Sequence, residues 1–418
     1  MHPGARLRPG RERWLMYDVM QGVRVIEVAE HTFAPSAAMI LADWGADVIK
    51  VERAAGGGDA GRTMRVIQRP GLRTNPFFEA ANRGKRGVGL DLTQSEGRDQ
   101  LYKLIDGADV FITNMRDGAR ARMGIEPDEL FARNPRLVYA RASGYGRKGP
   151  LAHHRGFDYP SSWCRSGSAF VQTPADGGPP PPQPGSVGDL TGGATMAGAI
   201  AAALFRRERT GRGALIDHAL YLIGAYIMSQ SIMSASLGWQ PQGTAPPRTE
   251  AADPANNIYR TKDGRWLVMC LLYDEWWPDL ARKLHREDWL SDPRYADPAA
   301  RAANNIALIA ELDALFATKT LAQWEDEFLD LEGAWSPLKS PAEVLTDAQA
   351  LENGFVTPVA FDDGSIYLTG ASPAQFDERP IGPLRAAPSH GQHTDDVMRE
   401  LGLTPEQIAS LRERGIVK

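Results

Sequence analysis

The sequence GVRVIEVAEHTFAPSAAMILADWGADVIKVER, residues 22–53, decides the fold. It contains two runs rich in β-branched residues, 23–28 and 47–51, which predict short strands. Between them, Pro35 occupies a position where the first turn of a helix tolerates proline, and Gly45 can end the helix. The segment therefore predicts a strand, a helix and a second strand, the repeating unit of a parallel sheet flanked by helices.

The same alternation of strand and helix patterns continues to about residue 146 and resumes after a loop rich in proline and glycine. Thr93 and Glu96 have the spacing of a capping box, which predicts a helix after the third strand. Asp189 or Thr191 can cap a long helix that runs to Arg206. The other predicted elements are strands at 88–92, 109–113, 137–142 and 215–217 and an apolar helix at 219–234. Together these patterns predict an α/β fold with a parallel sheet.

The length and a change in composition predict more than one folding unit. A chain of 418 residues exceeds one ordinary domain of about 150 residues. Glycine, proline and threonine become frequent near Leu237, and a hairpin pattern with Asp263 and Gly264 at its turn follows. Short β runs return beyond Pro341, before a C-terminal helix that Thr404 can cap. We place an extension at 1–20, a first α/β part at 21–236, a linker at 237–256, a smaller α+β domain at 257–340 and a last part at 341–418.

The composition argues against several classes of partner. The net charge of −5 gives no electrostatic reason to expect a nucleic acid. The only two cysteines, Cys164 and Cys270, argue against a disulfide framework and fit a reducing cytoplasm. No Cys/His spacing typical of a metal site occurs, and the longest uncharged stretch of the central region, 190–205, is shorter than the roughly 18 residues of a membrane span. We therefore expect a cytoplasmic protein with no metal, no nucleic acid and no membrane partner.

Gly144, Gly146 and Gly149 match the spacing of a dinucleotide-binding loop after the strand at 137–142. A helix should open directly after such a loop, but Pro150 follows instead. We therefore interpret these glycines as part of a tight turn and do not expect a nicotinamide site.

Asp189 stands in the segment GDLTGG, residues 188–193, between the loop 174–184 and the start of a helix. A helix N-terminus carries about half a positive charge, so a carboxylate there is expected to stay ionised and able to act as a nucleophile. Its small neighbours leave room for a substrate. An aspartate in this place is also commonly a helix cap, and the residues alone leave both interpretations open.

Six segments carry a resemblance to a known family. They are residues 22–53 as quoted above, NRGKRGVGLDL (82–92), ADVFITNMRDGARARMGI (108–125), NPRLVYARASGYGRKGP (134–150), GDLTGG (188–193) and RERTGRGALIDHAL (207–220). In this order they resemble the class III coenzyme A transferases of the CaiB/BaiF type, the family of formyl-CoA transferase and carnitine CoA-transferase. The resemblance covers most of residues 22–220, and the region after Leu237 is only weakly diagnostic.

The resemblance implies a large Rossmann-like domain, built from N- and C-terminal parts, and a smaller central α+β domain. It also implies that two such subunits interlock in a homodimer. Coenzyme A, carried as an acyl-CoA, and a carboxylic acid would be the substrates, and Asp189 would be the catalytic residue. The positions that match the family's coenzyme A contacts are His31, Thr32, Phe33, Arg53, Lys85, Asn114, Met115 and Arg122.

Coenzyme A carries a 3′-phosphate and a pyrophosphate, which need cationic partners. Arg53, Lys85 and Arg122 are the candidates, since they follow predicted strand ends or lie in turns, where ligands of parallel sheets bind. In the implied reaction, the Asp189 carboxylate attacks the donor thioester, and a mixed anhydride and an aspartyl-CoA thioester follow. Backbone amides of residues 188–193 are candidates for stabilising the oxyanions.

Departures from the family pattern leave alternatives open. Phe33 begins the triplet Phe-Ala-Pro where Ala-Gly-Pro is usual, and no glycine-rich loop of the formyl-CoA transferase kind occurs, which argues against oxalate or formate. Racemases of 2-methylacyl-CoA use a Gly-His-Asp segment, whereas this chain has Phe157 between Gly156 and Asp158, and phenylalanine is neither acid nor base. Transfer is therefore favoured over racemisation, and a non-catalytic binder of CoA esters is the third possibility. Residues that hint at a hydrophobic acyl group, or simply at packing, are Trp239, Tyr273, Trp276 and Trp277.

Overall fold

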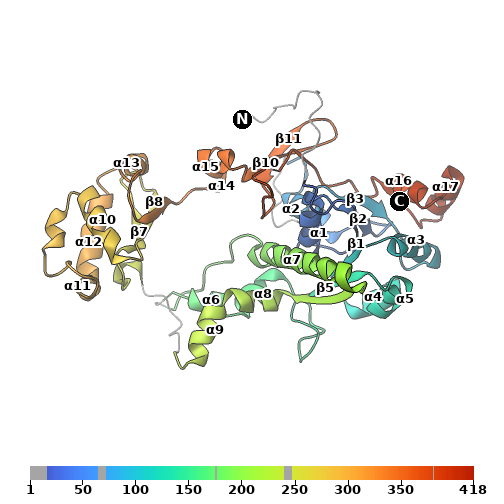
Figure 1. The fold of residues 1–418 in the computed structure, drawn as a ribbon, viewed down its shortest axis with the longest axis horizontal. Helices are drawn as coiled ribbons and strands as arrows, with labels where there is room; N and C mark the ends of the chain where they lie inside the picture. Colours follow the sequence, from blue (N-terminus) through green and yellow to red (C-terminus); the bar gives the residue numbers. More distant parts are fainter. Residues whose placement is uncertain (1–16, 65–71, 175–176, 240–246, 380) are drawn as a thin grey trace. The chain divides into compact units, whose positions relative to one another are not determined.

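The computed structural model describes residues 17–64, 72–174, 177–239, 247–379 and 381–418, which form two compact units. The first unit takes its described residues from Met1–Ala169, Pro182–Gln240 and Asp347–Lys418, and the second from Phe170–Pro181 and Pro241–Thr346. Figure 1 labels most of their helices and strands. Most of the extension predicted at 1–20, and part of the linker predicted at 237–256, lie outside the described residues.

A six-stranded parallel sheet in the order β3-β2-β1-β4-β5-β6 organises the first unit. Its strands are β1 (Arg24–Val28), β2 (Asp47–Glu52), β3 (Arg86–Gly89), β4 (Val110–Thr113), β5 (Val138–Ser143) and β6 (Ala214–Ala219). The parallel sheet predicted from the alternating pattern is therefore confirmed. The strand order reverses between β1 and β4, and such a reversal leaves a crevice at the carboxyl ends of the two strands, where α/β proteins bind ligands.

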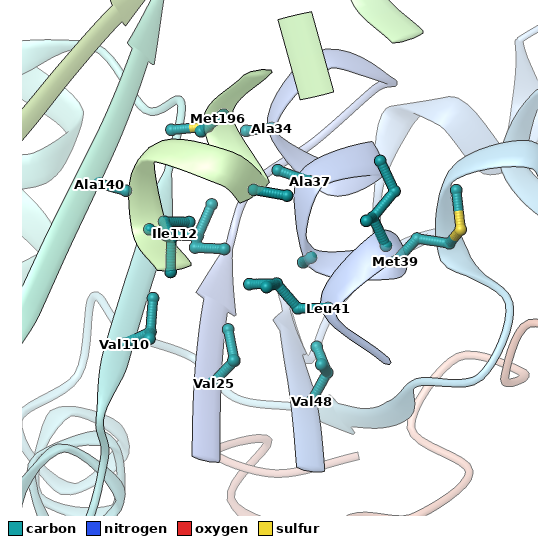
Figure 2. Close-up of a cluster of buried hydrophobic side chains, with 14 of the residues drawn as sticks. Val25, Ala34, Ala37, Met39, Leu41, Val48, Val110, Ile112, Ala140 and Met196 are labelled. Carbon is teal, nitrogen blue, oxygen red and sulfur yellow. The ribbon is translucent and has the colours of Figure 1, made fainter. Parts of the chain in front are cut away.

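One face of the sheet is covered by α1 (Phe33–Asp43) and α7 (Val187–Thr210). Figure 2 shows part of the core that they share with the strands: Val25, Ala34, Ala37, Met39, Leu41, Val48, Val110, Ile112, Ala140 and Met196. Within the described residues, α7 is the one helix whose length and composition would allow it to cross a membrane. Several of its apolar residues lie in this core, which accounts for their apolar character.

The two helices approach closely at Gly193. A Cβ atom built there would lie 1.9 Å from Ser36 Oγ and 3.0 Å from the backbone nitrogen of Ala37. We expect Gly193→Ala to lower the free energy of unfolding by about 1–3 kcal/mol, because it overpacks this contact. The matched control is Gly198→Ala in the same helix, where a Cβ meets no atom within 4 Å.

The control should raise the free energy of unfolding by about 0.5–1 kcal/mol, because alanine loses less backbone entropy than glycine on folding. Urea unfolding curves of the two variants test the contact. Equal effects of the same sign would contradict a close approach at Gly193.

The other face of the sheet is covered by helices from both ends of the chain. They are α3 (Ser95–Asp106), α5 (Pro127–Arg133), α16 (Thr394–Glu400) and α17 (Pro405–Glu413). Thr404 caps α17 as predicted, and Gln407 completes its capping box. The capping box predicted for α3 is wrong, since Gln94 occupies the N-cap and the Thr93 hydroxyl donates to Asp91 Oδ1 at 2.6 Å.

The remaining elements of the first unit surround this three-layer core. They are η1 (Ala60–Thr63), α2 (Pro76–Asn82), α4 (Asp117–Met123), η3 (Tyr159–Cys164), α8 (Leu220–Ile227), α9 (Ser229–Ser236), α15 (Ala348–Glu352) and the small sheet of β10 (Val356–Ala360), β11 (Ile366–Gly370) and β12 (Leu384–Arg385). The single helix predicted at 219–234 is two helices, which meet at Met228. The short helix α6 (Ser168–Val171) contains residues of both units.

The second unit contains an antiparallel sheet of β7 (Asn256–Arg260), β8 (Trp266–Cys270) and β9 (Ala334–Pro337). The predicted hairpin is confirmed, and Gly264 at its turn has a φ of 77°. Trp277 and Trp289 are buried and stack at 5.5 Å in the core, so Trp277 serves packing. The helices of this unit are η4 (Arg248–Glu250), η5 (Asp274–Trp276), α10 (Trp277–Lys283), η6 (Glu287–Leu290), α11 (Pro298–Ala303), α12 (Asn305–Phe316), α13 (Leu321–Glu327) and α14 (Pro341–Val344).

Candidate active site

Two cavities of the first unit involve the carboxyl ends of its central strands. The larger has a volume of about 700 Å³ and is lined by the segments that follow β1, β4 and β5, together with the first turn of α7. The smaller, of about 360 Å³, is lined by the ends of β1 and β2 and the segments that follow β1, β2 and β3. Glu30 and Met115 line both cavities. The two spaces therefore meet the crevice that the strand order creates.

Asp189 lies in the first turn of α7 and lines the larger cavity. The helix begins at Val187, and its N-cap residue is Ser186. The prediction that Asp189 or Thr191 caps the helix is therefore wrong, because both lie inside it. The sequence alone had left open that Asp189 serves only as an N-cap. The structure excludes that role.

A second carboxylate, Asp158, lies beside Asp189. The backbone amide of Asp189 donates to Asp158 Oδ2 at 3.1 Å, and the Ser162 hydroxyl donates to Asp158 Oδ1. Asp158 is only 8% exposed. Gly188 makes this approach possible, because a Cβ there would lie 2.1 Å from Asp158 Oδ1 and 2.2 Å from Ser162 Oγ.

Burial, and then the negative charge of Asp158, raise the pKa of Asp189 to about 7. The prediction that the helix N-terminus keeps this carboxylate ionised is therefore wrong near neutral pH. Removal from water and a like charge both disfavour the ionised form, and together they outweigh the half charge of the helix end. A carboxyl with such a shift in a cavity is typical of functional sites.

Among the backbone amides proposed as oxyanion donors, those of residues 189–193 are engaged elsewhere. The amide of Asp189 donates to Asp158, and the amide of Leu190 donates to the carbonyl of Ser186 at 2.9 Å. The following residues lie inside α7, where amides serve the helical hydrogen bonds. Stabilisation of an oxyanion by residues 189–193 would therefore require the first turn of the helix to open.

The family model for CoA-transferase family III matches residues 20–394. The chain belongs to this family. It is a CoA-transferase, and coenzyme A is the substrate that its family transfers. Nothing about the geometry above conflicts with this assignment, since both cavities lie within the matched residues.

Relatives with named reactions match nearly the whole transferase. It is 31% identical to (R)-2-hydroxy-4-methylpentanoate CoA-transferase of Clostridioides difficile, over 96% of this chain and all of the relative. It is 29% identical to cinnamoyl-CoA:phenyllactate CoA-transferase of Clostridium sporogenes, over 95% of this chain and 96% of the relative. A crystal structure of a CAIB/BAIF family protein from Brucella suis matches with a TM-score of 0.79 and 27% identity, over 91% of this chain and 99% of that one.

The structure brings most of the expected coenzyme A contacts of this transferase to the two cavities. His31, Phe33, Asn114, Met115 and Arg122 line the larger cavity with Asp189. Arg53 and Met115 line the smaller one. The amide group of Asn114 is also used internally, because its Nδ2 donates to the Glu30 carbonyl at 2.6 Å and its Oδ1 accepts from the Glu30 amide at 3.0 Å.

Two expected contacts, Lys85 and Thr32, line neither cavity. The Lys85 ammonium is buried and lies 2.5 Å from Glu27 Oε2 and 2.8 Å from the carbonyl of Pro35. Burial lowers its pKa to about 8. In this structure the Lys85 ammonium therefore links Glu27 of β1 to the first turn of α1 and does not offer its charge to a phosphate.

Small and aromatic residues form the wall near Asp189. The ring of Phe33 is buried and lies against Gly192, where a Cβ would come within 2.5 Å of it. The rings of His31 and Phe157 meet edge to face, with centroids 5.4 Å apart. Phe157 thus lies in the cavity wall. Its ring can pack there but can neither give nor take a proton.

Several cavity residues were not predicted from the sequence. In the smaller cavity they include Ala54, Ala55, Gly56, Asp59, Leu90, Asp91, Leu92 and Thr93. In the larger cavity they include Arg116, Arg147, Arg155, His153 and His154. The third strand ends at Gly89, and ligands of parallel sheets bind beyond the carboxyl ends of the strands. Residues 90–93 could have been found by this rule.

Proposed function

We propose that this CoA-transferase moves coenzyme A from an acyl-CoA to a free carboxylic acid, with Asp189 as the nucleophile. The observation that carries the proposal is a carboxylate in the first turn of α7, in a cavity of about 700 Å³, with a pKa raised to about 7. A partly desolvated carboxylate is a stronger nucleophile than a hydrated one once it is ionised.

The reaction then proceeds through two covalent intermediates on the Asp189 carboxyl group. Asp189 attacks the thioester carbonyl of the donor, which forms a mixed anhydride and releases the thiolate of coenzyme A. The thiolate attacks the Asp189 carbonyl of the anhydride, which gives an aspartyl-CoA thioester and the free donor acid. The acceptor carboxylate repeats both steps in reverse and leaves as its CoA ester, while Asp189 returns to a carboxylate.

The charged and apolar residues that line the two cavities support the binding of coenzyme A. The smaller cavity has Arg53 at its wall and apolar walls from Val28, Leu90 and Leu92, which suits a purine and a phosphate. The larger cavity carries Arg116 and Arg122 and ends at Asp189, which suits the pyrophosphate and the thioester arm. Glu30 and Met115 lie where the arm would pass from one cavity to the other.

The direct test uses the purified protein with a panel of acyl-CoA donors and free acids. The panel should contain 2-hydroxy acids, arylacrylic acids and aryllactic acids, since the two relatives with named reactions are named for such compounds. Mass spectrometry of the products should detect a new CoA ester that requires both a donor and an acceptor. Hydrolysis of the donor alone, with no transfer to any acid, would overturn the proposal.

The racemase alternative retains one supporting observation, because His31 supplies an imidazole to the same cavity as Asp189. It predicts exchange of the α-proton of a 2-methylacyl-CoA with deuterated water. Proton NMR of the acyl group measures that exchange in the absence of any acceptor acid. A non-catalytic binder would show neither exchange nor transfer, although it would bind coenzyme A.

We further propose that the enzyme is a cytoplasmic homodimer. Apolar side chains of α8, α9 and the residues after them are exposed in the single chain, among them Tyr226, Met233, Leu237 and Trp239. An exposed apolar surface of this kind supports association with a second copy. Light scattering of the purified protein should give about twice the chain mass of 45.7 kDa.

A further inference from the structure

His31 holds an unusual backbone conformation in the wall of the larger cavity. Its φ angle is 69°, in the left-handed region that non-glycine residues seldom occupy. Such a conformation persists only where the surrounding structure imposes it, and it concentrates at functional sites. The residues that impose it on His31 are therefore of functional interest.

Asp59 makes the contact that fixes this conformation. Its Oδ1 accepts from the amide of His31 at 3.0 Å and from the amide of Gly61 at 2.7 Å. The Asp59 amide in turn donates to Glu52 Oε2 at 2.8 Å. Asp59 is only 2% exposed, so these bonds do not compete with water.

A buried set of charges holds Asp59 in place. Its Oδ2 lies 2.8 Å from the ammonium of Lys50, which also lies 2.7 Å from Glu27 Oε1. Lys50 donates to the carbonyl of Ala29 at 2.9 Å as well. Burial by itself lowers the pKa of Lys50 and raises the pKa of Asp59. The neighbouring charges outweigh burial: Asp59 and Glu27 raise the pKa of Lys50, and Lys50 lowers the pKa of Asp59. The pair therefore remains ionised and rigid.

Asp59 and His31 belong to different cavities. Asp59 lines the smaller cavity, and His31 lines the larger one, where its ring meets Phe157. The hydrogen bond between them therefore links a residue of the smaller cavity to a residue of the larger one. The neighbouring residue Glu30 is also fixed, because its amide and its carbonyl both form hydrogen bonds with the side chain of Asn114.

We propose that Asp59 is a positioning residue, which places the His31 imidazole in the wall of the active-site cavity by accepting the His31 amide. The inference rests on the proposed function, because it gives His31 a role in the cavity that also contains Asp189. It goes beyond that function, because Asp59 itself touches no reacting atom. A shift of about 1 Å in such a wall can cost about 10²-fold in rate.

Three variants separate the amide contact from charge and from stability. Asp59→Ala removes the acceptor, whereas Asp59→Asn keeps one oxygen that can accept from His31 and puts an NH2 group in place of the oxygen that pairs with Lys50. Asp43→Ala is the matched control, since it breaks another buried ion pair, with Arg83 at 2.7 Å, and does not touch His31. All three should lower the melting temperature.

The kinetic result distinguishes them. We expect Asp59→Ala to lower kcat about 10-fold to 100-fold per folded molecule, and Asp59→Asn to retain more than a third of kcat. In the His31→Gly background the further effect of Asp59→Ala on kcat should shrink to about twofold, because glycine adopts the left-handed conformation without help. Equal losses in Asp59→Ala and Asp59→Asn, or an undiminished effect in the His31→Gly background, would overturn the inference.

A spectroscopic readout tests the placement without any turnover. The protein contains 8 histidines, and the ring carbon-bound proton of His31 is identified by its loss in His31→Gly. The ring current of Phe157 makes its chemical shift sensitive to position. The resonance should move in Asp59→Ala and stay in Asp59→Asn and Asp43→Ala.

The two readouts separate the two hypotheses. An unmoved resonance in Asp59→Ala would refute the positioning role while leaving the transfer reaction intact. A moved resonance in a protein that transfers no CoA would keep the structural link and refute the proposed function instead.

Discussion

Asp189→Asn and Asp189→Ala are expected to lower the kcat of CoA transfer by about 10³-fold or more. Asp189 would form both covalent intermediates, and an asparagine amide at the same place cannot attack a thioester. Removal of a nucleophile that splits one difficult step into easier ones commonly costs several orders of magnitude. Both variants should still fold, because the Asp189 carboxylate lines a cavity and does not cap α7.

The control lies on the same helix. Gly198→Ala changes an exposed position of α7 with no atom within 4 Å, so it should leave kcat unchanged. Hydroxylamine added with an acyl-CoA should convert Asp189 of the active protein to a hydroxamate, which peptide mass spectrometry detects. Turnover in Asp189→Asn above a few per cent, or a hydroxamate on another residue, would exclude Asp189 as the nucleophile.

Much of the first unit could be predicted because strands buried on both faces leave a strong local pattern. The runs at 23–28 and 47–51 are apolar and β-branched, and they become β1 and β2 in a parallel pair. Element ends were predicted less well. The third strand covers Arg86–Gly89 instead of 88–92. The residues after it make hydrogen bonds to other segments, since the Asp91 amide donates to the Ile416 carbonyl and Leu90 forms an isolated bridge with Val417.

The site could be predicted only as far as single residues carry a local signal. Asp189 stood out because of its glycine neighbours and the family resemblance. Its relation to Asp158 was invisible, since the two are 31 positions apart and meet only when Gly188 lets η3 approach α7. The burial of Lys85 was invisible for the same kind of reason: a basic residue in a turn looks exposed until the fold buries it against Glu27.

The environment that raises the pKa of Asp189 also makes the folded protein less stable when Asp189 is ionised. Burial and the charge of Asp158 raise its pKa, so the folded protein holds this proton more tightly than the unfolded chain does. Stability contributed by the protonated form therefore declines as the pH rises from about 4 to about 7 and stays lost above that range. Asp189→Asn carries no such charge. It should be more stable than the parent at pH 8 by about 1–3 kcal/mol, and no more stable near pH 4.

The same pKa sets the pH dependence of transfer. If the ionised form of Asp189 attacks, kcat/KM should fall about tenfold per pH unit below a pKa of about 7, and be about 10²-fold lower at pH 5 than at pH 8.

Asp158→Asn tests the cause. Asparagine can still accept from the Asp189 amide but carries no charge, so the acid limb should move to lower pH while burial keeps it above the ordinary aspartate range. Rates at fixed ionic strength from pH 5 to pH 9, with a donor stable over that range, measure both profiles. A flat profile between pH 5 and pH 8 in the parent would mean that Asp189 titrates elsewhere. If the pH at which kcat/KM falls does not change in Asp158→Asn, burial alone raises the pKa of Asp189.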